Sequence, residues 1–117
     1  MTTTNANLEG NWILQSGVEL PLAPNTEITA EFKDGKLSGY GGCNYYNTTY
    51  TVEPLDQHSG KIQLQGGIVS TRKGGANLKQ EGEYFNALKQ VGEYNLTDED
   101  LTLSYSSPWR YLNFIRQ

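Results

Sequence analysis

The 117-residue sequence contains a single cysteine, Cys43, and a single histidine, His58. One cysteine cannot form an internal disulfide and cannot build a metal site by itself. Basic residues are also few, since 9 lysines and arginines stand against 13 acidic residues and give a net charge of −4. Binding to nucleic acid requires a basic face for the phosphates, so this balance argues against a nucleic-acid partner.

Long apolar runs are missing as well. No stretch approaches the roughly 20 apolar residues that a transmembrane helix needs. The start of the chain, MTTTNAN, is polar and lacks the apolar core of a signal peptide. We expect residues 1–7 to form a flexible N-terminal segment and residues 8–117 to form one domain.

A catalytic set is also missing. Cys43 has no neighbouring histidine or lysine to activate its thiol, and His58 follows in a loop bounded by proline and glycine. The run Asp98-Glu99-Asp100 lacks the ligand spacing and the glycine of a calcium loop, so it is read as an acidic hairpin turn. We therefore expect no catalytic residue, no cofactor and no metal site.

Short segments that alternate between apolar and polar residues are abundant. They predict seven or eight strands, and Asp34-Gly35 predicts a tight type I′ turn between strands 26–32 and 37–41. Gly66-Gly67 is expected to separate a strand at 61–65 from another at 68–71. Such closely spaced strands favour a mainly antiparallel sheet that curls toward a barrel.

One helix is expected at about residues 78–91. Asn77 and Gln80 fit a capping box, and Gly92 fits the position after the last helical turn. The apolar stripe of this helix is predicted to consist of Leu78, Phe85, Leu88 and Val91. Glu81 and Glu83 are explained by the favourable field at a helix N-terminus.

Several motifs, taken in order along the chain, resemble those of the META/HslJ family. The Gly-Gly-Cys-Asn stretch is the most distinctive of them, because it joins permissive backbone to a small thiol and a hydrogen-bonding amide. The residues that match are Gly10, Trp12, Gly39, Gly42, Cys43, Asn44, Tyr46, Thr71, Glu81, Phe85 and Leu88. We interpret all of them as structural.

The resemblance implies a mainly β (α+β) fold, a lipocalin-like incomplete antiparallel β-barrel with one helix. Gly10-x-Trp12 also resembles the opening motif of the lipocalins. Members are bacterial proteins, often exported, that are linked to stress, and no catalytic activity is established for them. The resemblance favours the periplasmic side of the bacterial envelope if an export signal has been removed, and otherwise the cytoplasm.

One position departs from the family pattern. A second cysteine that the family usually carries is replaced by Gly75 in this sequence. A role that needs two thiols is therefore in doubt. We predict that Cys43 is a reduced, largely buried thiol near residues 71–76.

Three functions remain open. The leading hypothesis is a non-enzymatic module that acts in envelope maintenance or stress response by contacting another protein, with Tyr45, Tyr46 and Trp109 as candidate anchors. The alternative is a carrier of a small apolar ligand or lipid, which requires an apolar cavity of about 300 Å³ or more inside the barrel. An enzyme is the third hypothesis, and it requires His58 to lie within hydrogen-bonding reach of Cys43 or of a carboxylate.

Overall fold

A computed structural model describes residues 8–16, 27–71, 78–105 and 110–117. Within these residues the chain forms eight strands and one helix. The elements are β1 (Gly10–Ser16), β2 (Thr29–Lys33), β3 (Lys36–Tyr40), β4 (Tyr45–Pro54), β5 (Ser59–Ser70), α1 (Leu78–Gln90), β6 (Val91–Leu96), β7 (Asp100–Tyr105) and β8 (Arg110–Arg116). The predicted mainly β fold with one helix is confirmed.

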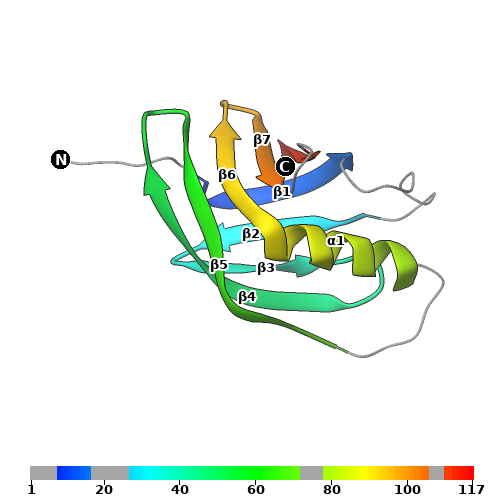
Figure 1. Ribbon diagram of the computed structural model, residues 1–117. Coiled ribbons are helices and arrows are strands. Elements are labelled where there is room, and N and C mark those ends of the chain that lie inside the picture. Colours follow the sequence, from blue (N-terminus) through cyan, green and yellow to red (C-terminus); the bar gives the residue numbers. More distant parts are fainter. Residues whose placement is uncertain (1–7, 17–26, 72–77, 106–109) are drawn as a thin grey trace.

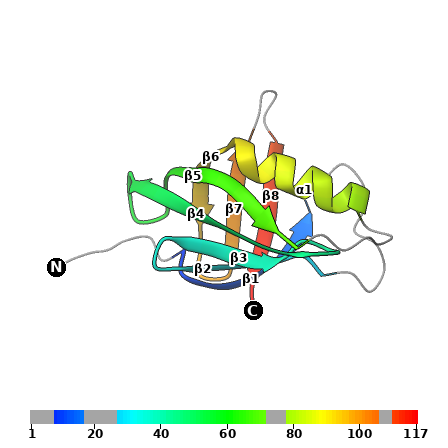
Figure 2. The same cartoon turned by 90° about the horizontal axis from the view of Figure 1, so that it is seen from below.

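Each strand pairs antiparallel with the next, and β8 returns to pair with β1, so the barrel is closed rather than incomplete (Figure 1). The ladder between β5 and β6 covers only the first part of β5, because it contains the pairs of Ser59, Gly60 and Lys61 alone. Beyond Lys61 the two strands separate. The helix α1 contacts β5 and β7 and crosses the end of the barrel where it enters β6 (Figure 2).

The turn between β2 and β3 has the predicted conformation. Asp34 and Gly35 have φ values of 53° and 80°. A type I′ turn requires positive φ at both central residues, and Asp-Gly is a preferred pair for it.

Two sequence-based boundaries are wrong. Gly66 and Gly67 do not end a strand, since β5 runs through them with an irregular register opposite Thr48. Gly92 does not terminate α1 either, because Val91 already begins β6. The proposed cap residue Asn77 lies outside the described residues.

The predicted stripe of the helix is confirmed in part, since Leu88 and Val91 are buried and Phe85 packs against the core. Leu78 is 46% exposed, so it does not belong to the core. The buried residues of α1 are Gln80, Glu81, Tyr84, Ala87 and Leu88. A purely apolar criterion misses this face because two of its members are polar.

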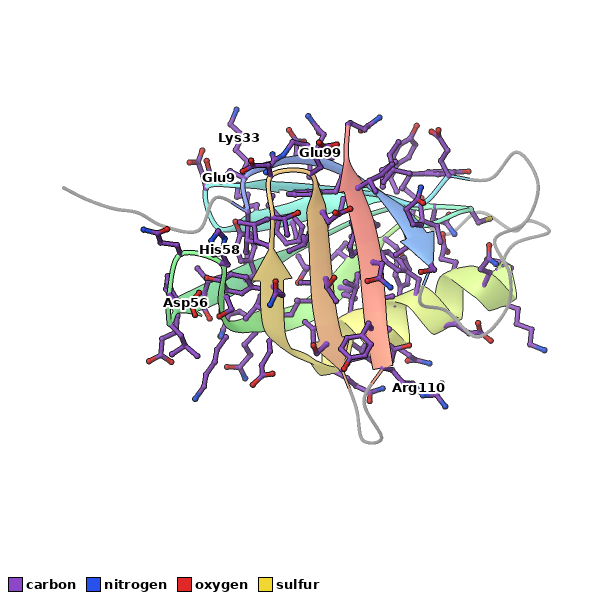
Figure 3. The ribbon with its side chains drawn as sticks, turned by 90° about the horizontal axis from the view of Figure 1, so that it is seen from above. Glu9, Lys33, Asp56, His58, Glu99 and Arg110 are labelled. Atoms are coloured by element: carbon purple, nitrogen blue, oxygen red, sulfur yellow. The ribbon has the colours of Figure 1, made fainter. Side chains whose placement is uncertain are left out.

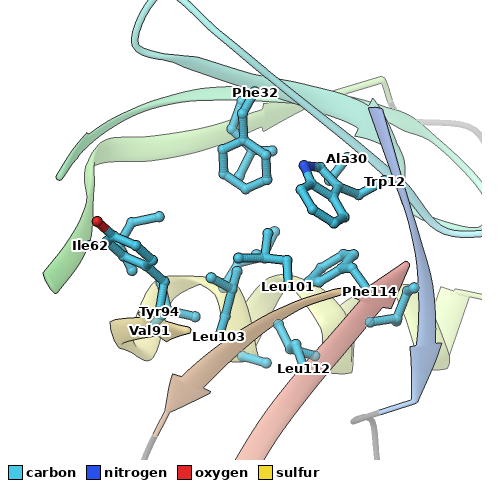
Figure 4. Close-up of a cluster of buried hydrophobic side chains, with 14 of the residues drawn as sticks. Trp12, Ala30, Phe32, Ile62, Val91, Tyr94, Leu101, Leu103, Leu112 and Phe114 are labelled. Atoms are coloured by element: carbon cyan, nitrogen blue, oxygen red, sulfur yellow. The ribbon is translucent and has the colours of Figure 1, made fainter. Parts of the chain in front are cut away.

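Inward-facing side chains of all eight strands meet in one core. Aromatic rings supply much of its volume, with Trp12, Phe32 and Phe114 almost completely buried (Figure 4). Phe85 is half-buried and packs against this core. Aromatic side chains bury large apolar areas, so the barrel interior is filled by the protein's own residues.

Candidate functional site

The glycine-rich turn at residues 41–44 connects β3 to β4 and forms the corner that the sequence predicts. Gly41 N–H donates a hydrogen bond to the Asn44 carbonyl oxygen at 2.8 Å. Gly42 has a φ of 111°, which residues with a Cβ rarely adopt. The backbone of this turn therefore depends on glycine.

The side chain of Glu81, from the first turn of α1, reaches into this corner. Its Oε2 accepts hydrogen bonds from Cys43 N–H at 3.0 Å and from Asn44 N–H at 2.5 Å. Its Oε1 accepts a hydrogen bond from Asn44 Nδ2 at 2.8 Å. Glu81 is only 4% exposed, and hydrogen bonds to a carboxylate are stronger than those to a neutral acceptor. One helical side chain therefore fixes the turn to the rest of the barrel.

Thr71, directly after β5, extends these contacts to a third element. Its hydroxyl donates to Asn44 Oδ1 at 2.9 Å and accepts from Tyr45 N–H at 3.2 Å. Its own N–H donates to the Tyr45 carbonyl oxygen at 3.0 Å. Residues 41–44, Thr71 and Glu81 thus form one hydrogen-bonded unit, which we call the corner network.

Two tyrosines lie buried near the corner network. The hydroxyl oxygens of Tyr46 and Tyr84 are 2.7 Å apart. Tyr46 donates to the Thr29 carbonyl oxygen at 2.8 Å, so Tyr84 is the donor within the pair. Burial, together with the neighbouring Tyr84, raises the pKa of Tyr46 well above its usual value, and burial also raises the pKa of Tyr84. Both phenols therefore stay protonated at neutral pH.

Two glycines allow close packing around the corner. A Cβ on Gly39 would lie 2.2 Å from the Thr29 carbonyl oxygen. A Cβ on Gly41 would lie 2.9 Å from the ring of Phe85 and 3.0 Å from Glu81 Oε2. The glycines are thus required by the contacts that hold β2 and α1 against the turn.

Trp12 and Arg116 form a second cluster, at the other end of the barrel. The two residues are direct partners in the β1–β8 ladder, and the Arg116 guanidinium lies 4.2 Å from the Trp12 ring centroid. Trp12 Nε1 donates to the Leu8 carbonyl oxygen at 2.9 Å, and Arg116 donates to the carbonyl oxygens of Glu9 and Asp98. Gly10 leaves room for this guanidinium, because a Cβ there would lie 2.7 Å from Arg116 Nη1.

The structure does not bring His58 and Cys43 together. Cys43 precedes β4 and His58 lies in the turn after it, and the 10 residues of β4 span about 30 Å at the rise of an extended strand. His58 is exposed beside Asp56 (Figure 3), whose carboxylate accepts the backbone N–H groups of His58 and Ser59. The described residues contain no cluster of histidine, cysteine and carboxylate side chains suited to a metal ion.

Cys43 itself is only partly buried, which is less than the predicted burial. Its neighbourhood is the corner network rather than a cleft with a general base. The loop at residues 72–77, which includes Gly75, lies outside the described residues. The arrangement around the thiol therefore supports a structural interpretation of the Gly-Cys-Asn motif.

The three candidate interaction residues have different outcomes. Tyr45 is 65% exposed on the outer face of β4. Tyr46 is 2% exposed, so its interpretation as a surface anchor is wrong; successive side chains of a strand point to opposite faces. Trp109 lies outside the described residues.

Tyr45 belongs to an apolar strip on the outside of the sheet. Its ring contacts that of Tyr40, its partner on β3, with 5.1 Å between the centroids. On the other side lies Val69 of β5, 64% exposed and paired with Asn47. We call Tyr40, Tyr45, Asn47 and Val69 the Tyr45 surface.

A cleft of about 320 Å³ opens where β5 separates from β6. Val52, Ile62 and Val91 line it together with polar and charged residues, among them Glu53 and Lys61. This mixed lining differs from the apolar cavity inside the barrel that the carrier hypothesis requires. The cleft is therefore a feature of the strand junction and not an apolar chamber in the core.

Sequence reasoning missed the roles of Glu81 and Arg116. An acidic residue in the first helical turn is already explained by the helix dipole, which hides its contact with a turn far away in the sequence. Arg116 had a usable signal, because it continues the inward alternation of Leu112 and Phe114. A charged residue in phase with buried neighbours indicates a specific partner.

Comparison with known protein families places the chain in a family. A family model described as the META domain matches residues 6–116, nearly the whole chain. No match is found among curated proteins or among solved structures. The described residues also contain no helix long and apolar enough to cross a membrane.

Proposed function

Because the chain belongs to the META domain family, we propose that it is a non-enzymatic module whose Tyr45 surface binds another protein. The setting proposed is stress response or maintenance of the bacterial envelope, as the family resemblance implies. The observation that carries the proposal is the exposure of Tyr45 and Val69 at diagonal positions of the neighbouring strands β4 and β5. Exposed aromatic residues on a rigid scaffold are common anchors of protein interfaces.

The Tyr45 surface is favoured over the other exposed apolar residues because its members lie on three neighbouring strands. Leu55 is a single residue in the turn between β4 and β5, and Tyr111 and Ile115 are four positions apart on β8. The strip from Tyr40 to Val69 instead crosses three neighbouring strands. Apolar side chains gathered on neighbouring strands exclude water from a contact more effectively than isolated side chains.

A carrier function has less support. A ligand in the barrel would have to displace the rings of Trp12, Phe32 and Phe114, all almost completely buried. Close-packed interiors tolerate such insertion poorly. The interaction proposal requires no change in the core.

Photo-crosslinking in cells of the source organism tests the proposal. We would place a photoreactive phenylalanine analogue at Asn47, which is exposed between Tyr45 and Val69, and a matched probe at Glu31, exposed on the outside of β2. We expect a discrete adduct of higher mass only from position 47, and its loss in the double variant Tyr45→Ser, Val69→Ser. Equal adducts from both positions, or none from position 47, would contradict the proposal.

A further inference from the structure

The C-terminal half of β5 is an open edge of the sheet. Among the described strands, β4 alone pairs with the segment from Ile62 to Ser70. The helix α1 also contacts β5, but it makes no ladder with it. Figure 1 shows this half of β5 along the lower rim of the sheet. An unpaired edge presents free backbone donors and acceptors to another chain.

Backbone alternation identifies the groups on the open side. Thr71 N–H points to β4, because it donates to the Tyr45 carbonyl oxygen at 3.0 Å. In an antiparallel strand, residues alternate between facing one neighbour and facing the other. Ser70 and Ile68 therefore direct their N–H and C=O groups to the open edge, while Val69 faces β4.

Native edges are usually protected by charge, proline or a bulge. The residues of this edge, Ile62 to Ser70, include no charged residue and no proline. The register is irregular between Gln65 and Val69, which interrupts the edge, and pairing is regular again at Val69 and Ser70. Val69, exposed on the outer face of this last segment, is also part of the Tyr45 surface.

We propose that this edge binds a second copy of the chain, with β5 pairing antiparallel to its counterpart about a two-fold axis at Val69. This inference rests on the proposed function, since it names a partner for the Tyr45 surface. Ile68 of each copy would pair with Ser70 of the other through their free backbone groups. The two Val69 residues would then face each other as a non-hydrogen-bonded pair, with Cα atoms about 4.5 Å apart.

The absence of charge along the edge and the position of the Tyr45 surface support a second copy as the partner. A two-fold contact places each residue against its own surface patch, so any charge near the axis would oppose a like charge. The segment from Ile68 to Thr71 is uncharged. The pairing also extends the apolar strip, because Tyr45 and Val69 of both copies become one continuous outer face. The paired segment is short, so we expect a weak dimer that depends on concentration.

Sedimentation equilibrium of the purified full chain tests the inference. We expect the apparent mass to rise with concentration from 13.0 kDa toward twice that value. Val69→Lys should abolish the rise by opposing two like charges at the axis, and an equimolar mixture with Val69→Glu should restore it. Gln63→Lys is the matched control, as it adds the same charge to an exposed position of β5 away from the axis, and it should leave the dimer unchanged.

A second variant tests the backbone pairing. Ser70→Pro removes only an N–H on the open side, so the ladder to β4 remains while the dimer is lost. In a Cys43→Ser background, Val69→Cys should form an intermolecular disulfide on oxidation, because the expected Cα separation lies in the range for such bonds. Val69→Cys should cross-link at least tenfold faster than Gln63→Cys in the same background.

A mass of one chain at every concentration would overturn the inference, as would a dimer that Val69→Lys leaves intact. Either result leaves the photo-crosslinking test of the Tyr45 surface valid. In that test, an adduct with the mass of a different protein still supports the proposed function. The two proposals therefore fail separately.

Discussion

Replacing Glu81 tests whether the corner network determines the stability of the barrel. The change Glu81→Ala removes the acceptor of three hydrogen bonds, from Cys43 N–H, Asn44 N–H and Asn44 Nδ2. Leaving a buried donor unsatisfied costs about 1–3 kcal/mol. Water can enter the space left by the truncated side chain and offset part of this cost. We expect the free energy of unfolding to fall by about 3–5 kcal/mol, a large part of the 5–15 kcal/mol typical of a domain.

The conservative change Glu81→Gln should cost less. The amide oxygen can keep both backbone N–H groups, but the amide nitrogen then faces the Asn44 Nδ2 donor. Rotation of the Asn44 amide relieves this conflict, because its oxygen can accept from the new amide. What remains is the loss of a charged acceptor, about 1–2 kcal/mol.

Urea unfolding followed by tryptophan fluorescence measures both effects, since Trp12 is completely buried. At an m-value of about 1–3 kcal/mol/M, Glu81→Ala should lower the midpoint by about 2 M. Lys79→Ala, at an exposed position of the same helix, is the control and should change stability by less than about 0.5 kcal/mol.

Thiol labelling supplies a local readout. Cys43 is held in the corner network by its backbone N–H, so release of the turn should accelerate the reaction of its thiol with a thiol reagent in native buffer. We expect faster labelling in Glu81→Ala than in the wild type and an unchanged rate in Lys79→Ala. A loss below about 1 kcal/mol together with unchanged labelling would refute the view that Glu81 fixes the corner.

Three further predictions follow from close contacts and from burial. Gly39→Ala should destabilise the protein by about 3 kcal/mol or more in urea unfolding, because the new Cβ would lie 2.2 Å from the Thr29 carbonyl oxygen. Gly92→Ala is the control: a Cβ there has no atom within 4 Å, so this change should cost less than about 0.5 kcal/mol. Because the pKa of Tyr84 is raised in the native state, the contribution of Tyr84 to stability should be constant below pH 10 and fall above it, where the unfolded chain ionises while the native phenol stays neutral. Tyr84→Phe should reduce the slope of the unfolding free energy against pH by about 1.4 kcal/mol per pH unit, measured between pH 10 and 12. Arg116→Lys should lower the thermal midpoint nearly as much as Arg116→Ala, because an ammonium group cannot both cover the Trp12 ring and reach two carbonyl oxygens; a midpoint equal to that of the wild type would contradict the role of the planar guanidinium.

The strands and the helix could be predicted because their signals are local. The Asp34-Gly35 pair determines its turn through backbone preferences of adjacent residues. Alternation along β2 and β4 is equally direct, since Ala30 and Phe32 on one strand and Tyr50 on the other are buried as their spacing requires. The fold class therefore needs no knowledge of distant contacts.

The face of α1 could not be predicted from the same kind of pattern. Its polar residue Glu81 is buried by a turn that lies 37 and 38 positions earlier in the sequence. An apolar stripe assigns Leu78 to the core and leaves Glu81 at the surface, and both assignments are wrong. A buried carboxylate is stable only where hydrogen-bond donors surround it. The donors to Glu81 come together only in the folded barrel, so a local sequence pattern does not reveal them.

The family motifs of this chain lie in two clusters, the corner network and the Trp12–Arg116 cluster, which we call the motif clusters. Their positions explain why the motifs identify the family but not the binding partner. Trp12 and Arg116 close one end of the barrel, and the corner network joins α1 to the turn at the other. The side chains of both clusters bond to other protein atoms, so these residues are needed for the fold. They do not restrict which side chains stand on the outer face of the sheet. Side chains such as Tyr45 and Val69 can then change without loss of the fold, because exposed positions away from such contacts usually alter stability by less than about 0.5 kcal/mol. Binding specificity in this protein is therefore expected to reside on the outer sheet and at the β5 edge, where the side chains of Tyr45 and Val69 belong to neither motif cluster.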